Sequence, residues 1–153
     1  QGAVGNLRFD PMAMLPFCGY NMADYFAHWL KLGDKADAEK LPQIFFVNWF
    51  RRDEDGRFLW PGYGENSRVL KWVFERVAGT VGADETPIGL LPTVGTLDIK
   101  GLQVSTDDLT ALLSVDIEGW KSAIPQIKEH YAQFGSALPS QLSGQLEALA
   151  LAL

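Results

Sequence analysis

Hydrophobic side chains recur at helical spacing near the start of the chain, which predicts an amphipathic helix after residue 21. Asn21 is a candidate N-cap because its side chain can accept a backbone N–H, and Gly33 is placed to end the helix. An earlier helix is expected at Asp10-Pro11, and Pro16 keeps it short. The positions that carry the helical spacing are Met22, Tyr25, Phe26, Trp29 and Leu30.

Residues 44–50 have a different pattern, because β-branched and aromatic side chains follow one another almost without a polar interruption. Such a run predicts a strand that is buried on both faces, as in the centre of an α/β sheet. Asp55-Gly56 is a turn dipeptide that could close a hairpin onto residues 58–60. Residues 61–64, with two glycines and a proline, predict a sharp turn.

A second helix is expected after residue 66, where apolar side chains again keep helical spacing. Its stripe consists of Val69, Leu70, Val73 and Val77. Residues 79–104 hold most of the remaining glycine and proline, which predicts irregular structure with a short strand near residues 88–91.

Three further helices are predicted towards the end of the chain. Ser105 to Asp108 has the form of a capping box that starts a helix through residues 109–113. Residues 120–131 keep helical spacing, with a kink or restart at Pro125, and Ser140 opens a last, leucine-rich helix. The predicted fold class is therefore α/β: a mixed sheet containing the 44–50 strand, with helices around it and a helical C-terminal half.

Composition and charge narrow the classes of function. The 153 residues are 47% hydrophobic and 21% charged, which is typical of a globular domain. Thirteen Lys and Arg against nineteen Asp and Glu give a net charge of −6, so a nucleic-acid or anionic membrane surface is disfavoured. Cys18 is the single cysteine and fits a reducing, cytosolic setting. His28 and His130 lack metal-ligand spacing, so no metal site is predicted in this chain.

The strongest candidate for chemistry is an aromatic cluster with an amide beside it. Phe50, Phe58 and Tyr63 lie on the predicted hairpin and turn, and Asn66 follows at the start of a helix. Aromatic faces bind flat heterocycles, and a carboxamide, with both donor and acceptor, can recognise the edge of a base such as guanine. The same pattern also fits aromatic residues of a core and an Asn66 that serves as a helix cap. The residues by themselves leave both interpretations open.

Two segments resemble a known family. Residues 46–70, which read FVNWFRRDEDGRFLWPGYGENSRVL, resemble the guanine-binding segment of the GTP-dependent phosphoenolpyruvate carboxykinases. Residues 10–21, which read DPMAMLPFCGYN, resemble the part of that family just after its mobile lid. The sequence of this motif looks actinobacterial. The resemblance extends to the end of the chain, including residues 86–89.

The resemblance implies a function and a set of site residues. The family converts oxaloacetate and GTP to phosphoenolpyruvate, GDP and carbon dioxide in gluconeogenesis. By resemblance, Phe50, Phe58 and Tyr63 enclose the guanine and Asn66 hydrogen-bonds its edge. Tyr63 stands where a phenylalanine is usual, which keeps the stacking face and adds a hydroxyl. No catalytic residue and no metal ligand is expected in this chain.

The resemblance also implies what this chain is part of. The whole chain is interpreted as a C-terminal fragment of the GTP-binding domain of the carboxykinase fold. Within it, residues 1–9 are the end of the active-site lid, 44–78 the guanine-binding segment and 105–153 a helical C-terminal region.

The rest of the active site is expected outside this chain. The phosphate-binding loop, the ligands of Mn2+ and of nucleotide-bound Mg2+, and the arginines for oxaloacetate would lie upstream. The fragment alone is therefore predicted to be inactive and poorly stable, with an exposed sheet edge that needs the remainder of the same polypeptide. The full enzyme would be a cytoplasmic monomer that binds neither nucleic acid nor membrane. The rival hypotheses are a stand-alone guanine-nucleotide-binding module without catalysis and a purely structural α/β domain.

Overall fold

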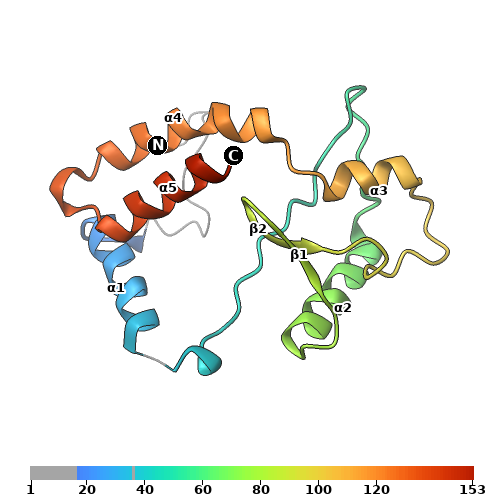
Figure 1. Cartoon of the computed structure of the whole chain (residues 1–153), viewed down its shortest axis with the longest axis horizontal. Helices are drawn as coiled ribbons and strands as arrows, with labels where there is room; N and C mark the ends of the chain where they lie inside the picture. The colour runs from blue at the N-terminus through green and yellow to red at the C-terminus, as the bar shows by residue number, and fades with distance from the viewer. Residues whose placement is uncertain (1–16, 36) are drawn as a thin grey trace. The chain divides into compact units, whose positions relative to one another are not determined.

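The computed structural model describes residues 17–35 and 37–153 (Figure 1). It divides into two compact units: the described residues up to Leu41 together with Ile117–Leu153, and Pro42–Asp116. The predicted helix at Asp10-Pro11 and the predicted lid end at residues 1–9 lie outside the described residues.

The first unit is helical, with α1 (Met22–Lys35), α4 (Ile117–Ala132) and α5 (Ser140–Ala152) and the short 3-10 turns Ala38–Lys40 and Gly135–Ala137. Asn21 caps α1 as predicted, because its Oδ1 accepts the backbone N–H of Ala23 at 2.9 Å. The helix continues past Gly33, so the predicted stop there is wrong. The Phe26 ring meets the Phe134 ring edge to face at 5.4 Å and packs α1 against the end of α4.

The second unit contains α2 (Asn66–Val77), α3 (Thr106–Leu113) and a two-stranded antiparallel sheet of β1 (Ala83–Thr86) and β2 (Gly89–Pro92). The strands pair from Ala83 with Pro92 to Thr86 with Gly89. The core of this unit is a cluster of four buried hydrophobic side chains, Trp60, Trp72, Leu97 and Leu109. Helices α2 and α3 contribute Trp72 and Leu109, and Trp60 comes from the segment that carries the predicted aromatic cluster.

The predicted mixed sheet is wrong, because residues 44–50 form no strand. A strand is defined by ladder hydrogen bonds to a neighbour, and β1 and β2 pair only with each other. The burial nevertheless alternates along this segment: Phe45 and Trp49 pack against the core, whereas Ile44 and Phe46 are 85% and 91% exposed. The described residues therefore form an α/β fragment in which this apolar segment has one covered face and one bare face.

Helix α2 buries only part of the predicted stripe. Val69, Trp72 and Val73 pack in the core, with Trp72 only 4% exposed. Leu70 and Val77, which the stripe included, are exposed, and so is Phe74 between them. Helix α2 thus carries apolar side chains on two faces, and this unit covers only one of them.

The C-terminal helices form close to where they were predicted. Ser105 and Asp108 make both hydrogen bonds of a capping box at the start of α3. Pro125 lies inside α4, which continues as one helix, and α5 begins at Ser140. The predicted helical region 105–153 thus contains these three helices, but α3 belongs to the second unit, whereas α4 and α5 belong to the first.

Candidate functional site

Phe50 and Phe58 are brought together by a tight loop, which turns at the predicted Asp55-Gly56 dipeptide. Arg52 and Phe58 form an antiparallel bridge, and the backbone N–H of Asp53 donates to the carbonyl of Arg57 at 3.0 Å. Gly56 closes the turn at φ +81°, a conformation that favours glycine. The Phe50 and Phe58 rings consequently lie 6.2 Å apart between centroids.

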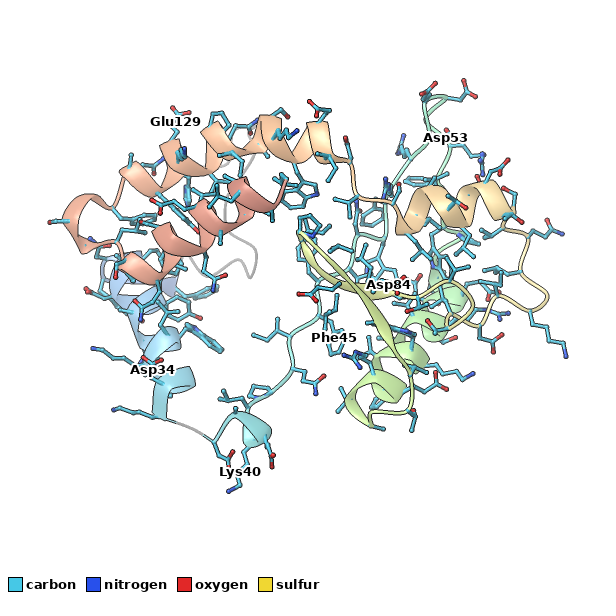
Figure 2. All side chains as sticks on the ribbon, viewed as in Figure 1. Asp34, Lys40, Phe45, Asp53, Asp84 and Glu129 are labelled. Atoms are coloured by element: carbon cyan, nitrogen blue, oxygen red, sulfur yellow. The ribbon has the colours of Figure 1, made fainter. Side chains whose placement is uncertain are left out.

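This loop is fastened to α3 by arginine side chains. Arg57 donates to Asp108 at 2.6 Å and also pairs with Asp53 at 3.0 Å, near the loop tip labelled in Figure 2. The Arg57 hydrogen bond, with the Ser105 contacts, holds the pKa of Asp108 below its usual value. Arg51 donates to the carbonyls of Leu112 and Ser114 at 3.2 and 3.0 Å. The position of Phe58 thus depends on α3, which is some fifty residues away in sequence.

The two phenylalanine rings contact each other instead of enclosing a gap. They meet at 60° and 6.2 Å, whereas two parallel rings that sandwich a base are about 7 Å apart, twice a van der Waals separation of about 3.5 Å. One face of Phe58 is covered by the Arg52 guanidinium, whose central carbon lies 4.2 Å from the ring centroid. Phe50 is 73% exposed and so offers the larger free aromatic surface.

Tyr63 lies on the sharp turn predicted at residues 61–64. Gly62 has φ +76° and Tyr63 itself φ +43°, a left-handed conformation that is uncommon for a residue with a side chain. A 3-10 turn (Tyr63–Glu65) follows, and Ser67 and Arg68 of α2 hold it through Gly64 and Glu65 respectively. The Tyr63 ring is 97% exposed, so the turn presents it almost entirely to solvent.

Asn66 is the first residue of α2 but does not cap it. The N-cap position is occupied by Glu65, and no side chain there makes a capping hydrogen bond. The Asn66 Oδ1 instead accepts the indole N–H of Trp60 at 2.9 Å. The capping interpretation of Asn66 is therefore wrong. The partnership with Trp60 carries no spacing signal in the sequence, so sequence reasoning missed it.

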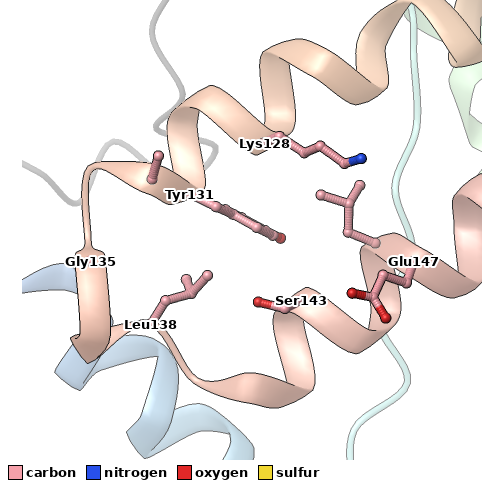
Figure 3. Close-up of a pocket in the computed structure, with 8 residues that line it drawn as sticks. Lys128, Tyr131, Gly135, Leu138, Ser143 and Glu147 are labelled. Atoms are coloured by element: carbon pink, nitrogen blue, oxygen red, sulfur yellow. The ribbon is translucent and has the colours of Figure 1, made fainter.

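A hollow of about 260 Å³ lies in the first unit, between α4 and α5. Figure 3 shows Tyr131 and Lys128 facing Ser143 and Glu147 across it. It contains none of the predicted site residues and is smaller than the ~300–1,000 Å³ usual for ligand sites.

The described part of the chain holds neither a metal-binding cluster nor a membrane-spanning helix. Residues 17–35 and 37–153 bring together no group of three His, Cys, Asp or Glu side chains suited to a metal ion. Within the same ranges, no helix has both the length and the apolar character that crossing a membrane requires.

Comparison with known proteins identifies the family. The family model described as "Phosphoenolpyruvate carboxykinase C-terminal P-loop domain" matches residues 1–152. The chain therefore belongs to the GTP-dependent phosphoenolpyruvate carboxykinase family, and the predicted resemblance is confirmed.

Curated relatives carry the corresponding name, phosphoenolpyruvate carboxykinase (GTP). The protein of Treponema pallidum (strain Nichols) is 60% identical over 147 residues, or 95% of this chain. Those of Neocallimastix frontalis and Renibacterium salmoninarum are 58% and 53% identical over 97% of this chain. In each case the match covers 24% of the relative, so this chain spans about a quarter of the length of these proteins.

Proposed function

We propose that this chain is the guanine-binding part of a GTP-dependent phosphoenolpyruvate carboxykinase, a carboxy-lyase. The observation that carries the proposal is the family match over residues 1–152, together with relatives named for GTP at 53–60% identity. The whole enzyme would convert oxaloacetate and GTP to phosphoenolpyruvate, GDP and carbon dioxide. This chain would bind the base end of the nucleotide and position it.

The geometry supports a particular place for the base. Because Phe50 and Phe58 contact each other, a purine would stack on the exposed face of Phe50. By the family resemblance, Tyr63 would form the other wall of the site. Phe58, covered by Arg52, would support Phe50 from its edge. Base–aromatic stacking is worth about 1–3 kcal/mol per base. Asn66 would then recognise the edge of the guanine.

The other parts of the reaction are assigned to the remaining polypeptide. Phosphoryl transfer needs positive charge around the γ-phosphate, and the resemblance places the phosphate-binding loop, the Mn2+ and Mg2+ ligands and the substrate arginines upstream. When bound, the metal ions would neutralise developing negative charge. The chain alone would therefore be inactive. The single thiol, Cys18, is compatible with a cytoplasmic location, and a monomeric enzyme follows from the resemblance only.

The bare apolar surfaces support association with that remaining polypeptide. Ile44 and Phe46 are 85% and 91% exposed on one side of the 44–50 segment. Helix α2 exposes Leu70, Phe74 and Val77 at helical spacing. Contiguous apolar surface of this kind is rare on monomers and indicates a buried interface. We propose that other residues of the same polypeptide cover both surfaces.

The rival hypotheses differ in measurable ways. A stand-alone binding module would bind guanine nucleotide without needing any further polypeptide for its function. A structural domain would bind none, so guanine nucleotide would leave the fluorescence of Trp49 and Trp60 unchanged. The family match favours the enzyme part over both.

The proposed site is tested by Phe50→Ala in the full-length protein that contains this chain. Loss of the stacking face should weaken GTP binding about 5- to 150-fold, as 1–3 kcal/mol implies. Isothermal titration calorimetry with GTP measures the effect. Phe50→Leu keeps an apolar side chain without an aromatic face and should also bind weakly, whereas Phe50→Tyr should bind nearly normally. Unchanged GTP affinity in Phe50→Ala would contradict the proposed site.

A further inference from the structure

We propose that Trp60 is a positioning residue that makes this site select guanine over adenine, by fixing which end of the Asn66 carboxamide faces the base. The proposal rests on the proposed function of the aromatic site. It adds a residue that would not touch the nucleotide and would act only through Asn66.

The indole of Trp60 is held firmly in the core of the second unit. Trp60 is 5% exposed and packs in the cluster that includes Trp72, Leu97 and Leu109. Side chains in a close-packed core keep a single rotamer, so the direction of the indole N–H is fixed. That N–H lies 2.9 Å from Asn66 Oδ1.

This hydrogen bond determines the orientation of the Asn66 amide. An indole nitrogen is a donor only, whereas a carboxamide has an acceptor oxygen at one end and a donor NH2 group at the other. If the amide turned over, two donors would face each other and the buried indole N–H would lose its partner. Leaving a buried donor unpaired is costly, so one lone pair of the oxygen stays on Trp60 and the positions of the oxygen and the NH2 group cannot be exchanged.

The two purines differ in what they present to such a group. Guanine carries the acceptor O6, and adenine carries the donor N6–H2 in the same place. A fixed NH2 group donates to O6 but opposes another donor. The second lone pair of Oδ1 remains for the N1–H that neighbours O6 in guanine. An amide free to turn over would serve either base, so the selectivity depends on the Trp60 hydrogen bond.

The chain offers a matched pair of variants for the test. Trp60→Phe removes the N–H and keeps an aromatic ring in the core. Trp72→Phe makes the same change at another buried indole, whose N–H donates to Thr96 at 3.1 Å instead of to Asn66. Both variants lose packing contacts in the core, but only Trp60→Phe removes the hydrogen bond that holds the Asn66 carboxamide.

The experiment measures GTP and ATP affinities by calorimetry in the full-length protein that contains this chain. In Trp60→Phe the preference for GTP over ATP should fall about tenfold, through weaker GTP and stronger ATP binding. In Trp72→Phe the preference should stay within about twofold of the wild-type value. In an Asn66→Ala background, Trp60→Phe should change the preference no further. A preference that is unchanged in Trp60→Phe, or that falls equally in Trp72→Phe, would overturn the proposal.

A second variant keeps the test decisive if Trp60→Phe does not fold. Asn66→Asp sits at the first turn of a helix, where an acidic side chain is tolerated, and it still accepts the indole N–H but has no donor end. It should lose most of the GTP preference, and retention of that preference would also overturn the proposal. If instead the wild-type protein binds no GTP, or Phe50→Ala leaves GTP affinity unchanged, the proposed function itself fails.

Discussion

At the scale of single residues, Tyr63 combines an unfavourable backbone with the most exposed of the predicted rings. Its φ of +43° follows Gly62 at +76°, and its side chain is 97% exposed. A left-handed backbone conformation costs a residue with a Cβ about 1–3 kcal/mol, and the exposed Tyr63 side chain regains none of this energy by burial. Strain of this kind is typical of residues whose position serves binding and not folding.

Tyr63→Gly should therefore separate stability from binding in the full-length protein. Glycine relieves about 1–3 kcal/mol of backbone strain but costs about 0.5–1 kcal/mol through the entropy of the unfolded chain, so the free energy of unfolding should stay the same or rise by up to about 2 kcal/mol. GTP affinity should fall about 5- to 150-fold because a stacking face is lost. Urea unfolding and calorimetry measure the two quantities. Tyr63→Phe, the control, should bind normally, and full GTP affinity in Tyr63→Gly would refute the role of this ring.

Asn66 has a role that its neighbours in sequence do not specify. The sequence indicated both a cap and a base-recognising amide, because either role suits an asparagine before an apolar helix. The structure excludes the cap, because Glu65 occupies the N-cap position and the Asn66 Oδ1 accepts the Trp60 indole N–H instead of a helix N–H. The role of Asn66 towards guanine stays a prediction, as do those of Phe50, Phe58 and Tyr63.

At the scale of elements, the 51–58 loop and α3 form one connected structure. Arg57 joins the loop to Asp108, which also completes the capping box with Ser105. The Asp108 carboxylate thus stabilises both the start of α3 and the loop that carries Phe58. Because its pKa is lowered by the Arg57 and Ser105 hydrogen bonds, the charged form stabilises the folded state.

Asp108→Asn should weaken this connection in a pH-dependent way. A carboxylate whose pKa is lowered on folding contributes its full stabilisation above the unfolded value of about 3.9 and loses it as the pH falls through the folded value. The variant should thus unfold more easily than wild type at pH 7, and the difference should shrink below about pH 4. Chemical unfolding across this pH range measures it. Asp107→Asn, a neighbour without an ion pair among the described residues, is the control. A constant difference at all pH values would argue against the ion pair.

The strand predicted at residues 44–50 does not form, because a local pattern cannot specify a strand's partner. Its continuous apolar run predicted a strand with both faces buried, and the structure instead covers only alternate side chains such as Phe45 and Trp49. Strand formation depends on a partner that lies elsewhere in sequence, which local pattern does not specify. Turns and caps, such as Gly56 and Ser105, were predicted correctly because their hydrogen bonds close within a few residues.

At the scale of the whole molecule, the described residues bury little apolar surface. Over residues 17–35 and 37–153, eight hydrophobic side chains are buried, and no large side chain among them is completely inaccessible. Meanwhile Ile44, Phe46 and Phe74 are each more than three-quarters exposed. A core this thin supports the expectation that the chain is poorly stable in isolation and depends on contacts with further polypeptide.

Phe46→Ala tests this dependence in the full-length protein. Although the ring is 91% exposed in this structure, truncation should lower the free energy of unfolding by about 3 kcal/mol, the cost of removing a buried phenylalanine. Val94→Ala is the control, since Val94 is 73% exposed but lies outside the two bare apolar surfaces, and it should cost less than about 0.5 kcal/mol. Urea unfolding measures both. An equally small effect for Phe46→Ala would mean that nothing covers this segment.

The sequence by itself determined the helices, the turns at Gly56 and Gly62, and the family, because these depend on residues close together in the chain or on long matching motifs. Only the tertiary structure decided which face of α2 is buried, that Phe50 and Phe58 touch, that Arg57 reaches Asp108, and that Trp60 holds Asn66. These contacts join elements that pack around a shared core, and a local sequence pattern does not specify how such a core packs.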